Sequence, residues 1–449
     1  MNDTICAVIT GSGGAVAVIR VSGPEAWQCA LKLTKSSNGP EVNRVYHQKL
    51  FDGDFLLDKA LVTYFKAPKS FTGGDTVEFA CHASNYIKGR LLQILSDMGV
   101  RPAKNGEFSM RAFINGKMDL VEANGLCDLI ASDNAASHGA AMNSMEGKLS
   151  AEFKRIKNSL SELLAQIEVR IDDVDEEMQP LDPGYTKKIL NDVKLRAGDL
   201  ASTFSTGKFV KEGIKVAILG VPNAGKSSLL NAIVGFDRAI VSEHSGTTRD
   251  TVEEIADFKG HKIILTDTAG IKEGALDVAE REGMRRSLNA ADKSDIIIFT
   301  ADTSKKHLQA DHELWNSLKI KGKKIILACN KKDINFTPPE FLYEADKVVN
   351  VSSKTGEGVE ELKNSVISLL DAGDIKADSN LITSAVHYDM LVKTEKELEE
   401  ALKALKKDLG LEFLAEHVRR ALLHLKEIIG EVYADDILGI IFSKFCVGK

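Results

Sequence analysis

The chain has 449 residues, which at about 100 to 200 residues per domain predicts roughly three domains and excludes a single small fold. Hydrophobic residues make up 43% and charged residues 27%, with 35 glycines and 9 prolines, so a disordered, collagenous or low-complexity chain is excluded. The net charge of -7, from 58 Lys and Arg against 65 Asp and Glu, provides no global basic field and by itself argues against a stand-alone nucleic-acid binder.

The cysteines and the first residues of the chain indicate its compartment. The cysteines are Cys6, Cys29, Cys81, Cys127, Cys329 and Cys446. They contain no C-x-x-C pair and no close spacing, so the sequence predicts neither a disulfide framework nor a zinc site. The N-terminal segment lacks the basic and apolar regions of an export signal, and no apolar run approaches the roughly 18 residues of a membrane span. We therefore expect a cytoplasmic protein with no membrane partner.

The first two segments of the chain differ in their periodicity. Residues 1–118 contain short strand-like runs such as AVAVIRVSG, ALVTYF and TVEFACH, with one helical stretch after Asn85, and predict an α+β domain. Residues 119–212 have helical periodicity, as in LSAEFKRIKNSLSELLAQIEVRI, interrupted by the acidic run at 172–177 and by two prolines. We interpret residues 119–212 as the first half of a helical domain.

Residues 213–372 alternate between strand-like runs and helical segments. The runs KVAILG, KIILTD, DIIIFTA, KKIILAC and KVVNVSS have the rhythm of a parallel sheet built from βαβ units. Residues 373–449 are helical again almost to the end. Because neither helical stretch looks self-sufficient, we predict a multidomain α/β and α+β protein in which an α/β domain is inserted into a discontinuous helical domain.

A phosphate-binding loop is the strongest chemical signal in the sequence. Residues 220–227 read G-x-x-x-x-G-K-S between the strand KVAILG and the helix SSLLNAIV, the context that this motif requires. The glycines let backbone N–H groups surround a phosphate, Lys226 reaches the β- and γ-phosphates, and the Ser227 hydroxyl ligates Mg2+. A Gly-rich turn without a ligand is the alternative, which this context disfavours. The expected nucleotide contacts are Asn223, Ala224, Gly225, Lys226, Ser227 and Ser228.

Three later motifs indicate that the nucleotide carries guanine. The D-T-A-G run places an Asp where it reaches Mg2+ through water and a Gly N–H at the γ-phosphate. The carboxylate of the N-K-x-D run accepts both the ring N–H and the exocyclic amine of guanine, which adenine does not offer. A later Ser-Ser-Lys run completes the base pocket. In this order the motifs predict a GTPase with a Ras-like P-loop G domain at 213–372. The residues are Asp267, Thr268, Ala269, Gly270, Asn330, Lys331, Asp333, Ser352, Ser353 and Lys354.

A candidate switch loop lies between the phosphate-binding helix and the D-T-A-G strand. It reads Gly-Thr-Thr-Arg-Asp at 246–250, and we assign the second Mg2+ ligand to Thr248. A solvated polar loop is the alternative. The residue after D-T-A-G is Ile271 and not a Gln able to orient the attacking water, so water positioning and charge neutralisation must come from elsewhere.

Several segments outside the GTPase motifs also form a recognisable pattern: AVIRVSG at 17–23, SFTGGD at 70–75, GEFSMRAF at 106–113, KMDL at 117–120 and the C-terminal FCVGK. With these segments and the GTPase motifs, the chain resembles over nearly its whole length the MnmE (also called TrmE) family of bacterial and organellar tRNA-modification GTPases. The resemblance implies a homodimer that forms a heterotetramer with the flavoprotein MnmG and acts on tRNA. It also implies K+-dependent GTP hydrolysis and a (carboxymethyl)aminomethyl group formed at C5 of the wobble uridine.

The same resemblance assigns the cation and the water-orienting residue. It places K+ where other GTPases receive an arginine finger, within a shell of oxygen ligands that suits a hard cation. It places a glutamate that orients water in an E-R-x-G segment, which here assigns Glu280 as catalytic, with Asp277 and Glu282 as alternatives. The K+ ligands carried over are Asn223, Ser242, His244 and Thr247, and the nucleotide contacts around them are Glu243, Ser245, Gly246 and Thr248.

For residues 1–118 the resemblance implies a dimerisation module that binds 5-formyl- or methylene-tetrahydrofolate. Arginine and lysine suit the anionic glutamyl tail of such a ligand, and a carboxylate suits the donor edge of its pterin. Surface ion pairs are the alternative interpretation of the same residues. The expected contacts are Arg20, Glu78, Lys117 and, approaching in the dimer, Lys449.

The C-terminal Cys446 has three interpretations. The resemblance favours a functional thiol near the folate site, acting as nucleophile or proton donor, whereas a frayed tail is the ordinary state of a chain end. A prenylation box fits the Gly and the terminal Lys poorly. The chain departs from the family pattern at Gly74, at 81–84 and at 384–387, which leaves the roles of these positions open.

A rival function is a regulatory GTPase that assists ribosome assembly or a similar process as a switch and performs no modification chemistry. This function shares the central motifs but does not explain Arg20, Lys117 or the FCVGK motif. The basic residues at 419, 420 and 426 are interpreted as the solvated face of an amphipathic helix, with contact to RNA phosphates as the alternative.

Overall fold

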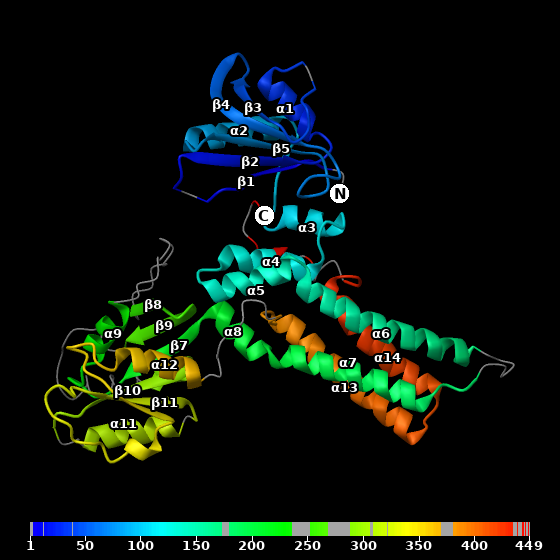
Figure 1. The fold of residues 1–449 in the computed structure, drawn as a ribbon. Helices are drawn as coiled ribbons and strands as arrows, with labels where there is room; N and C mark the ends of the chain where they lie inside the picture. The colour runs from blue at the N-terminus through cyan, green and yellow to red at the C-terminus, as the bar shows by residue number, and fades with distance from the viewer. Residues whose placement is uncertain are drawn as a thin grey trace. The chain divides into compact units, whose positions relative to one another are not determined.

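The computed structural model of the chain describes residues 3–11, 13–37, 39–172, 179–235, 252–267, 288–305, 309–320, 322–369, 380–433, 438, 442–443, 445 and 448. The chain forms two compact units, whose elements are drawn in Figure 1. Unit 1 comprises Met1–Cys127, Ser150–Asn191 and Lys396–Lys449, and unit 2 comprises Asp128–Leu149 and Asp192–Glu395.

A six-stranded sheet in the order β3-β4-β5-β2-β1-β6 is the centre of the N-terminal part of unit 1. Every second residue along β5 is buried deeply, which gives the sheet one face toward a core and one face away from it. The core face packs against α1 and α2 through residues such as Leu33, Phe79 and Leu91. The elements are β1 Ile5–Val8, β2 Val16–Ser22, α1 Ala26–Thr34, β3 Val45–Asp52, β4 Phe55–Phe65, β5 Thr76–His82, α2 Asn85–Asp97 and β6 Arg101–Pro102.

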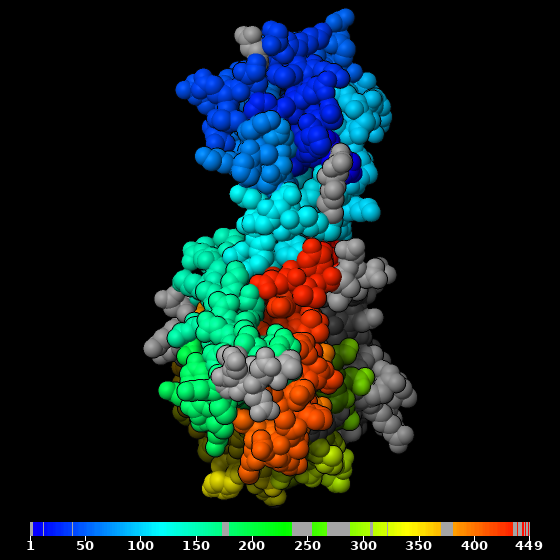
Figure 2. Space-filling model, turned by 90° about the vertical axis from the view of Figure 1, so that its right-hand side faces the viewer, coloured from blue at the N-terminus to red at the C-terminus, as the bar shows by residue number. Residues whose placement is uncertain are grey.

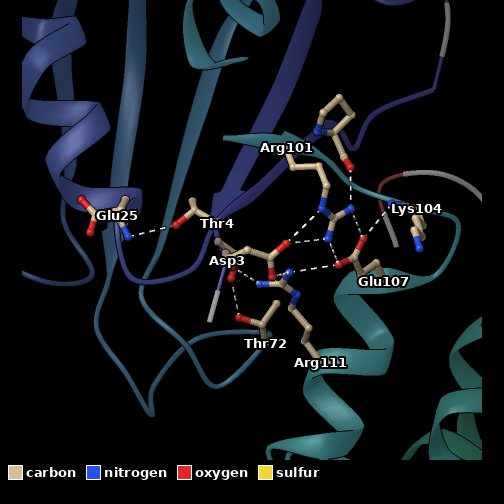
Figure 3. A network of polar contacts seen from close by, with 10 residues as sticks. Asp3, Thr4, Glu25, Thr72, Arg101, Lys104, Glu107 and Arg111 are labelled. Atoms are coloured by element: carbon tan, nitrogen blue, oxygen red, sulfur yellow. Dashed lines mark hydrogen bonds and ion pairs between the residues drawn. The ribbon is translucent and has the colours of Figure 1, made fainter. Parts of the chain in front are cut away.

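A partly buried ionic cluster joins α3 (Glu107–Ile114) to the N-terminal residues and β6 of the same unit. Figure 3 shows Arg101 and Arg111 converging on the carboxylates of Asp3 and Glu107. Arg101 lies 2.6 Å from Glu107, which also accepts a hydrogen bond of 2.8 Å from the backbone N–H of Lys104. Burial raises the pKa of Glu107, but the hydrogen bonds from Arg101, Lys104 and Arg111 outweigh it, so the pKa is lowered.

Replacing Glu107 by Gln will destabilise unit 1 by about 3 kcal/mol at pH 7, because two arginines lose a buried counter-charge. Because the pKa of Glu107 is lower in the folded than in the unfolded protein, its ionised carboxylate stabilises the folded state. This stabilisation is complete when the pH is above the unfolded pKa near 4.5, and it is lost as the pH falls through the folded pKa. The difference between wild type and variant should therefore shrink at about pH 4. Urea unfolding followed by Trp27 fluorescence in a Trp315→Phe background measures it, and an equal difference at both pH values would contradict this account.

The remaining helices range from the 9 residues of α8 to the 24 residues of α6, and α14 is amphipathic. In α14 the residues Leu414, Val418, Leu422 and Leu425 are buried at helical spacing, as the sequence periodicity predicts. The bounds are α4 Leu120–Ala131, α5 Ala135–Met145, α6 Lys148–Ile171, α7 Pro183–Ser202, α8 Phe204–Glu212, α13 Ala385–Lys407 and α14 Leu411–Ile429. Among the described residues no helix combines the length and the apolar character needed to cross a membrane.

The described C-terminal residues pack into unit 1 beside α3 and α4. Phe442 and Phe445 are buried with Phe113 and Leu120, and Figure 2 shows the red C-terminal segment directly against the cyan one. Gly106, with φ +63, lies so close to the carbonyl oxygen of Phe442 that a Cβ would approach it to 2.3 Å. The C-terminal segment is thus docked against a position that accepts only glycine.

A second six-stranded sheet, in the order β12-β11-β10-β7-β9-β8, forms the centre of unit 2. All neighbouring strands are parallel except β8, which runs antiparallel to β9. One face packs against α9 and α12, and the other packs against α11. The elements are β7 Ile214–Leu219, α9 Lys226–Val234, β8 Val252–Phe258, β9 His261–Asp267, β10 Ile296–Asp302, α11 Gln309–Lys319, β11 Lys324–Asn330, the 3-10 turn η1 Leu342–Glu344, β12 Lys347–Asn350 and α12 Val359–Leu369.

Candidate functional site

The sheet of unit 2 brings several sequence motifs to one edge. The parallel strands β7, β10, β11 and β12 all end at this edge, and each is followed by a polar loop. The strand β7 lies between β10 and β9, so the strand order reverses at β7 and the connections run toward opposite ends of the sheet on its two sides. Such a reversal opens a crevice at the carboxyl ends of the strands, where ligands bind in open α/β sheets.

The phosphate-binding loop is shaped by two glycines at positive φ. Gly220 has φ +150 and lies against the Thr300 carbonyl, which a Cβ would approach to 2.4 Å. Gly225 has φ +94 and lies against Asn330, whose Nδ2 a Cβ would approach to 2.3 Å. Immediately after Gly225, α9 begins at Lys226, and the partial positive charge of its N-terminus favours a phosphate there.

Asn330 connects the phosphate-binding loop to the last base-pocket loop. It is fully buried, its Nδ2 donates to the Ala224 carbonyl at 2.9 Å, and its Oδ1 accepts from the Ser353 N–H at 3.1 Å. The sequence assigned Asn330 a nucleotide contact, and the structure shows that its side chain ties three loops together. Asn330 therefore holds these loops in a fixed arrangement.

Asp333 and Lys331 lie at the same edge of the sheet. The carboxylate of Asp333 is exposed, and its Oδ1 accepts from the Ser352 hydroxyl at 2.8 Å. Lys331 donates to the carbonyl of Asn223 at 2.9 Å, which joins the base-recognition run to the phosphate-binding loop. The structure thus brings 223–227, 330–333 and 352–354 into one site, although they lie far apart in the sequence.

Two residues that the motif analysis did not single out complete this edge. Asp302 ends β10 with its side chain 6% exposed and pairs with Lys331 at 2.7 Å. Burial raises the pKa of Asp302, but hydrogen bonds from Lys331 and Ser304 outweigh it, and the pKa is lowered. Thr303 donates to the Asn330 carbonyl from its N–H at 3.0 Å and from its hydroxyl at 2.7 Å. The sequence signal that could have found them is the pair of polar residues, Asp302 and Thr303, at the end of the buried parallel strand β10.

Several predicted site residues lie outside the described residues. The β9 strand ends at Asp267, which places the backbone of this residue at the same edge, but its side chain is not described. The residues outside are Ser242, Glu243, His244, Ser245, Gly246, Thr247, Thr248, Thr268, Ala269, Gly270, Asp277, Glu280, Glu282, Cys446 and Lys449.

A second polar site lies on the face of the unit 1 sheet opposite α1 and α2. Arg20 of β2 and Glu78 of β5 are direct cross-strand partners, and Arg20 Nε lies 2.8 Å from Glu78 Oε1. The Arg20 guanidinium lies over the rings of Phe71 and Phe108, at 4.7 and 5.4 Å from their centroids. The charge pair is therefore mostly buried and lies against aromatic rings.

Two further segments approach this second site. Lys117 donates to the carbonyl of Pro68 at 3.1 Å, and its side chain packs near Gly73, on the loop that also carries Phe71. Gly448, with φ +98, lies against the carbonyl of Val8, which a Cβ would approach to 2.5 Å. Val8 is adjacent to Ala7, the residue that pairs with Arg20, so Gly448 lies beside the β1 strand within unit 1.

The positions that depart from the family pattern in this region have ordinary structural roles. Burial raises the pKa of the Cys81 thiol to about 11, which keeps it protonated at neutral pH. His82 lies beside Asp58, with Nδ1 and a carboxylate oxygen 2.8 Å apart. The carbonyl of Gly74 accepts a hydrogen bond from the Ser70 hydroxyl at 2.5 Å.

The basic residues of α14 are paired within unit 1. Arg419 lies 3.0 Å from Glu168, and Arg420 lies 2.7 Å from Glu416. Both arginines are more than half exposed, which fits a solvated helix face.

The chain matches two family models, one described as the MnmE helical domain over residues 120–446 and one as the GTP-binding protein TrmE N-terminus over residues 4–117. Among curated relatives, the tRNA modification GTPase MnmE of Christiangramia forsetii is 36% identical over all of this chain and all of its own length. That of Cytophaga hutchinsonii is 37% identical over 100% of this chain and 98% of its own. Among solved structures, the G domain of the T. maritima FeoB iron transporter is 32% identical over 34% of this chain and 97% of its own, with a TM-score of 0.27.

Proposed function

The chain belongs to the MnmE family of tRNA modification GTPases and is a GTP hydrolase that acts in tRNA modification, and from this premise we propose how it works. We propose a homodimer that acts with the flavoprotein MnmG in the cytoplasm. Its product is an aminomethyl-type group at C5 of the wobble uridine of certain tRNAs, with the one-carbon unit taken from a tetrahydrofolate. The observation that carries the proposal is the joining of the phosphate-binding and base-recognition loops into one site through Asn330.

GTP would bind across the carboxyl edge of the unit 2 sheet. Its phosphates would lie at the N-terminus of α9, which begins at Lys226 directly after Gly225. Its guanine would lie at Asp333, whose exposed carboxylate accepts two hydrogen bonds from the base. The exposed Ser227 hydroxyl in the first turn of α9 is a suitable Mg2+ ligand, with Thr248 proposed as the second.

The potassium site is proposed from the oxygen chemistry of one described residue. Asn223 is exposed, and its backbone carbonyl is held by Lys331, so its amide oxygen fits a hard monovalent cation. When bound, K+ supplies positive charge that stabilises the charge developing between the β- and γ-phosphates. Ser242, His244 and Thr247 are proposed as further ligands, and Glu280 is proposed to orient the attacking water. Equal rates of GTP hydrolysis in K+ and in Na+ would contradict the potassium site.

Tetrahydrofolate is proposed to bind at the Arg20–Glu78 pair. The pair supplies donors for the glutamyl carboxylates and an acceptor for the pterin, and the rings of Phe71 and Phe108 supply apolar surface. Lys117 and Lys449 would add charge for the anionic tail, and Cys446 would supply a thiol. When bound, the folate supplies the one-carbon unit.

Replacing Arg20 by Met will weaken binding of 5-formyl-tetrahydrofolate by about tenfold, because a charge-assisted contact is lost while the bulk of the side chain is retained. Equilibrium dialysis measures this change. Arg44→Met is the matched control, since Arg44 pairs with Glu41 on the surface of the same domain and should leave binding unchanged. Equal affinities of the Arg20 variant and the wild type would remove the folate site from this position.

The nucleotide cycle would act as a gate on the modification reaction. GTP and K+ would bring the two G domains of the dimer together, and hydrolysis would release them. The rival function, a regulatory switch in ribosome assembly, uses the same G domain but gives no role to the Arg20–Glu78 site. The two functions differ in one observable: a strain that lacks this chain should lose modified wobble uridines only if the chain acts in their synthesis.

A further inference from the structure

The structure shows an ionic chain that runs from the end of β10 to the phosphate-binding loop. Asp302 Oδ1 accepts hydrogen bonds from the Ser304 N–H at 3.0 Å and the Ser304 hydroxyl at 2.6 Å. Its Oδ2 accepts one of 2.7 Å from Lys331. Only 6% of the Asp302 side chain is exposed, so the carboxylate is fixed within the protein and aimed at the lysine.

Lys331 combines an unusual backbone conformation with two hydrogen bonds from its ammonium group. Its backbone has φ +65, a left-handed conformation that residues other than glycine rarely adopt. Its Nζ donates to Asp302 and, at 2.9 Å, to the carbonyl of Asn223. Asn223 also has a positive φ, of +66. Two strained residues on different loops are therefore joined through one lysine, whose charge is balanced by Asp302.

The sheet register makes this arrangement possible. In the parallel pairing of β10 with β11, Asp302 stands opposite Asn330, the residue that precedes Lys331. The lysine side chain can therefore reach back to the carboxylate of the neighbouring strand and forward to the phosphate-binding loop. Without the carboxylate, the Asn223 carbonyl would be the remaining of the two Nζ contacts described above, and fixing the long lysine side chain would cost more conformational entropy per contact.

We propose that Asp302 is a positioning residue for guanine-nucleotide binding: it holds Lys331 in place, and through Lys331 it holds the phosphate-binding loop at Asn223. The proposal rests on the proposed binding of GTP at this edge. Asp302 itself lies behind Lys331 and acts through it. The contact between Asp302 and Lys331 exists before any nucleotide binds, so it stabilises the bound substrate and the transition state equally. Loss of this contact should therefore raise KM and leave kcat nearly unchanged.

A double-mutant cycle in the full-length chain tests the proposal, with the fluorescent analogue mant-GDP as probe. Asp302→Asn keeps the shape of the side chain and removes its charge, and we expect about tenfold weaker binding. Lys331→Met should weaken binding by a similar factor, and the double variant should bind no more weakly than Lys331→Met alone. The proposal would be overturned if the loss of affinity in the double variant equalled the product of the two single losses. An unchanged dissociation constant in Asp302→Asn would also overturn it.

Asp346 offers a matched control at the amino ends of the strands of the same sheet, where it directly precedes β12. It accepts from the Ile325 N–H at 2.8 Å and lies 3.3 Å from Lys324, so it also pairs with a backbone donor and a lysine. Asp346→Asn should leave mant-GDP affinity unchanged. An equal loss in both variants would show that general damage to the sheet, and not positioning of Lys331, is measured, and would overturn the proposal.

Two further measurements separate the possible failures. A wild-type chain that binds no guanine nucleotide would refute the proposed function, whereas normal wild-type binding with an unaffected Asp302→Asn variant refutes only the role of Asp302. If Asp302→Asn does not fold, Ser304→Ala removes one donor that orients the carboxylate and must weaken binding by about threefold. Unchanged affinity in Ser304→Ala would then overturn the proposal.

Discussion

In the Gly225→Ala variant, guanine-nucleotide binding will fall by at least a hundredfold, which corresponds to about 2.7 kcal/mol. The new Cβ would lie 2.3 Å from Asn330 Nδ2, a side chain that is fully buried and hydrogen-bonded at both ends. Moving the Asn330 side chain away would break its two hydrogen bonds, and φ +94 is itself unfavourable for alanine. Titration with mant-GDP measures the loss.

Gly260→Ala is the control for this substitution. Gly260 has φ +86 in the turn between β8 and β9, and nothing lies within 4 Å of a Cβ built there. The control should cost roughly 1 kcal/mol of stability and leave nucleotide affinity unchanged. Near-normal affinity in Gly225→Ala would show that the loop adapts and that the contact with Asn330 does not shape the site.

Asp333→Asn will reverse the base preference of the site. The carboxylate accepts from both the ring N–H and the exocyclic amine of guanine, whereas an amide sets an N–H donor against that amine. Guanine-nucleotide affinity should fall roughly a hundredfold, because one good contact is replaced by two facing donors. Xanthine carries an oxygen in place of the amine, so the amide matches it, and affinity for the xanthine nucleotide should rise.

Competition between GDP and xanthosine diphosphate for mant-GDP, in wild type and variant, measures this reversal. Ser352→Ala is a useful companion, since it removes only the hydroxyl that donates to Asp333 at 2.8 Å and should weaken GDP binding without changing the preference. If Asp333→Asn still prefers guanine, the base does not lie at this carboxylate.

The strongly patterned parts of the fold could be predicted from the sequence. The five runs from KVAILG to KVVNVSS correspond to β7, β9, β10, β11 and β12, because strands buried on both faces consist of nearly continuous apolar residues. The edge strand β8 was not predicted, since its sequence VEEIADF carries three carboxylates and pairs on one side only. Likewise α1, only nine residues long, was missed beside the one predicted helix after Asn85.

The site could be predicted as a set of motifs but not as a set of contacts. The spacing of a motif indicates what binds, and it located Lys226, Asn330 and Asp333 at one edge. That Asn330 is a buried brace and that Lys331 pairs with Asp302 depends on the register of β10 against β11, which no local pattern encodes. The approach of Gly448 to Val8 joins the two ends of the chain, and only the fold brings them together.

The most direct test of the central claim is a mass-spectrometric measurement of wobble-uridine nucleosides in tRNA from a strain that lacks this chain. We predict that the aminomethyl-type nucleosides are absent, that the wild-type chain restores them, and that the Gly225→Ala variant does not. Unchanged wobble uridines in the deletion strain would contradict the account and favour the regulatory switch. Full restoration by a Gly225→Ala variant shown not to bind guanine nucleotide would separate the modification from GTP hydrolysis.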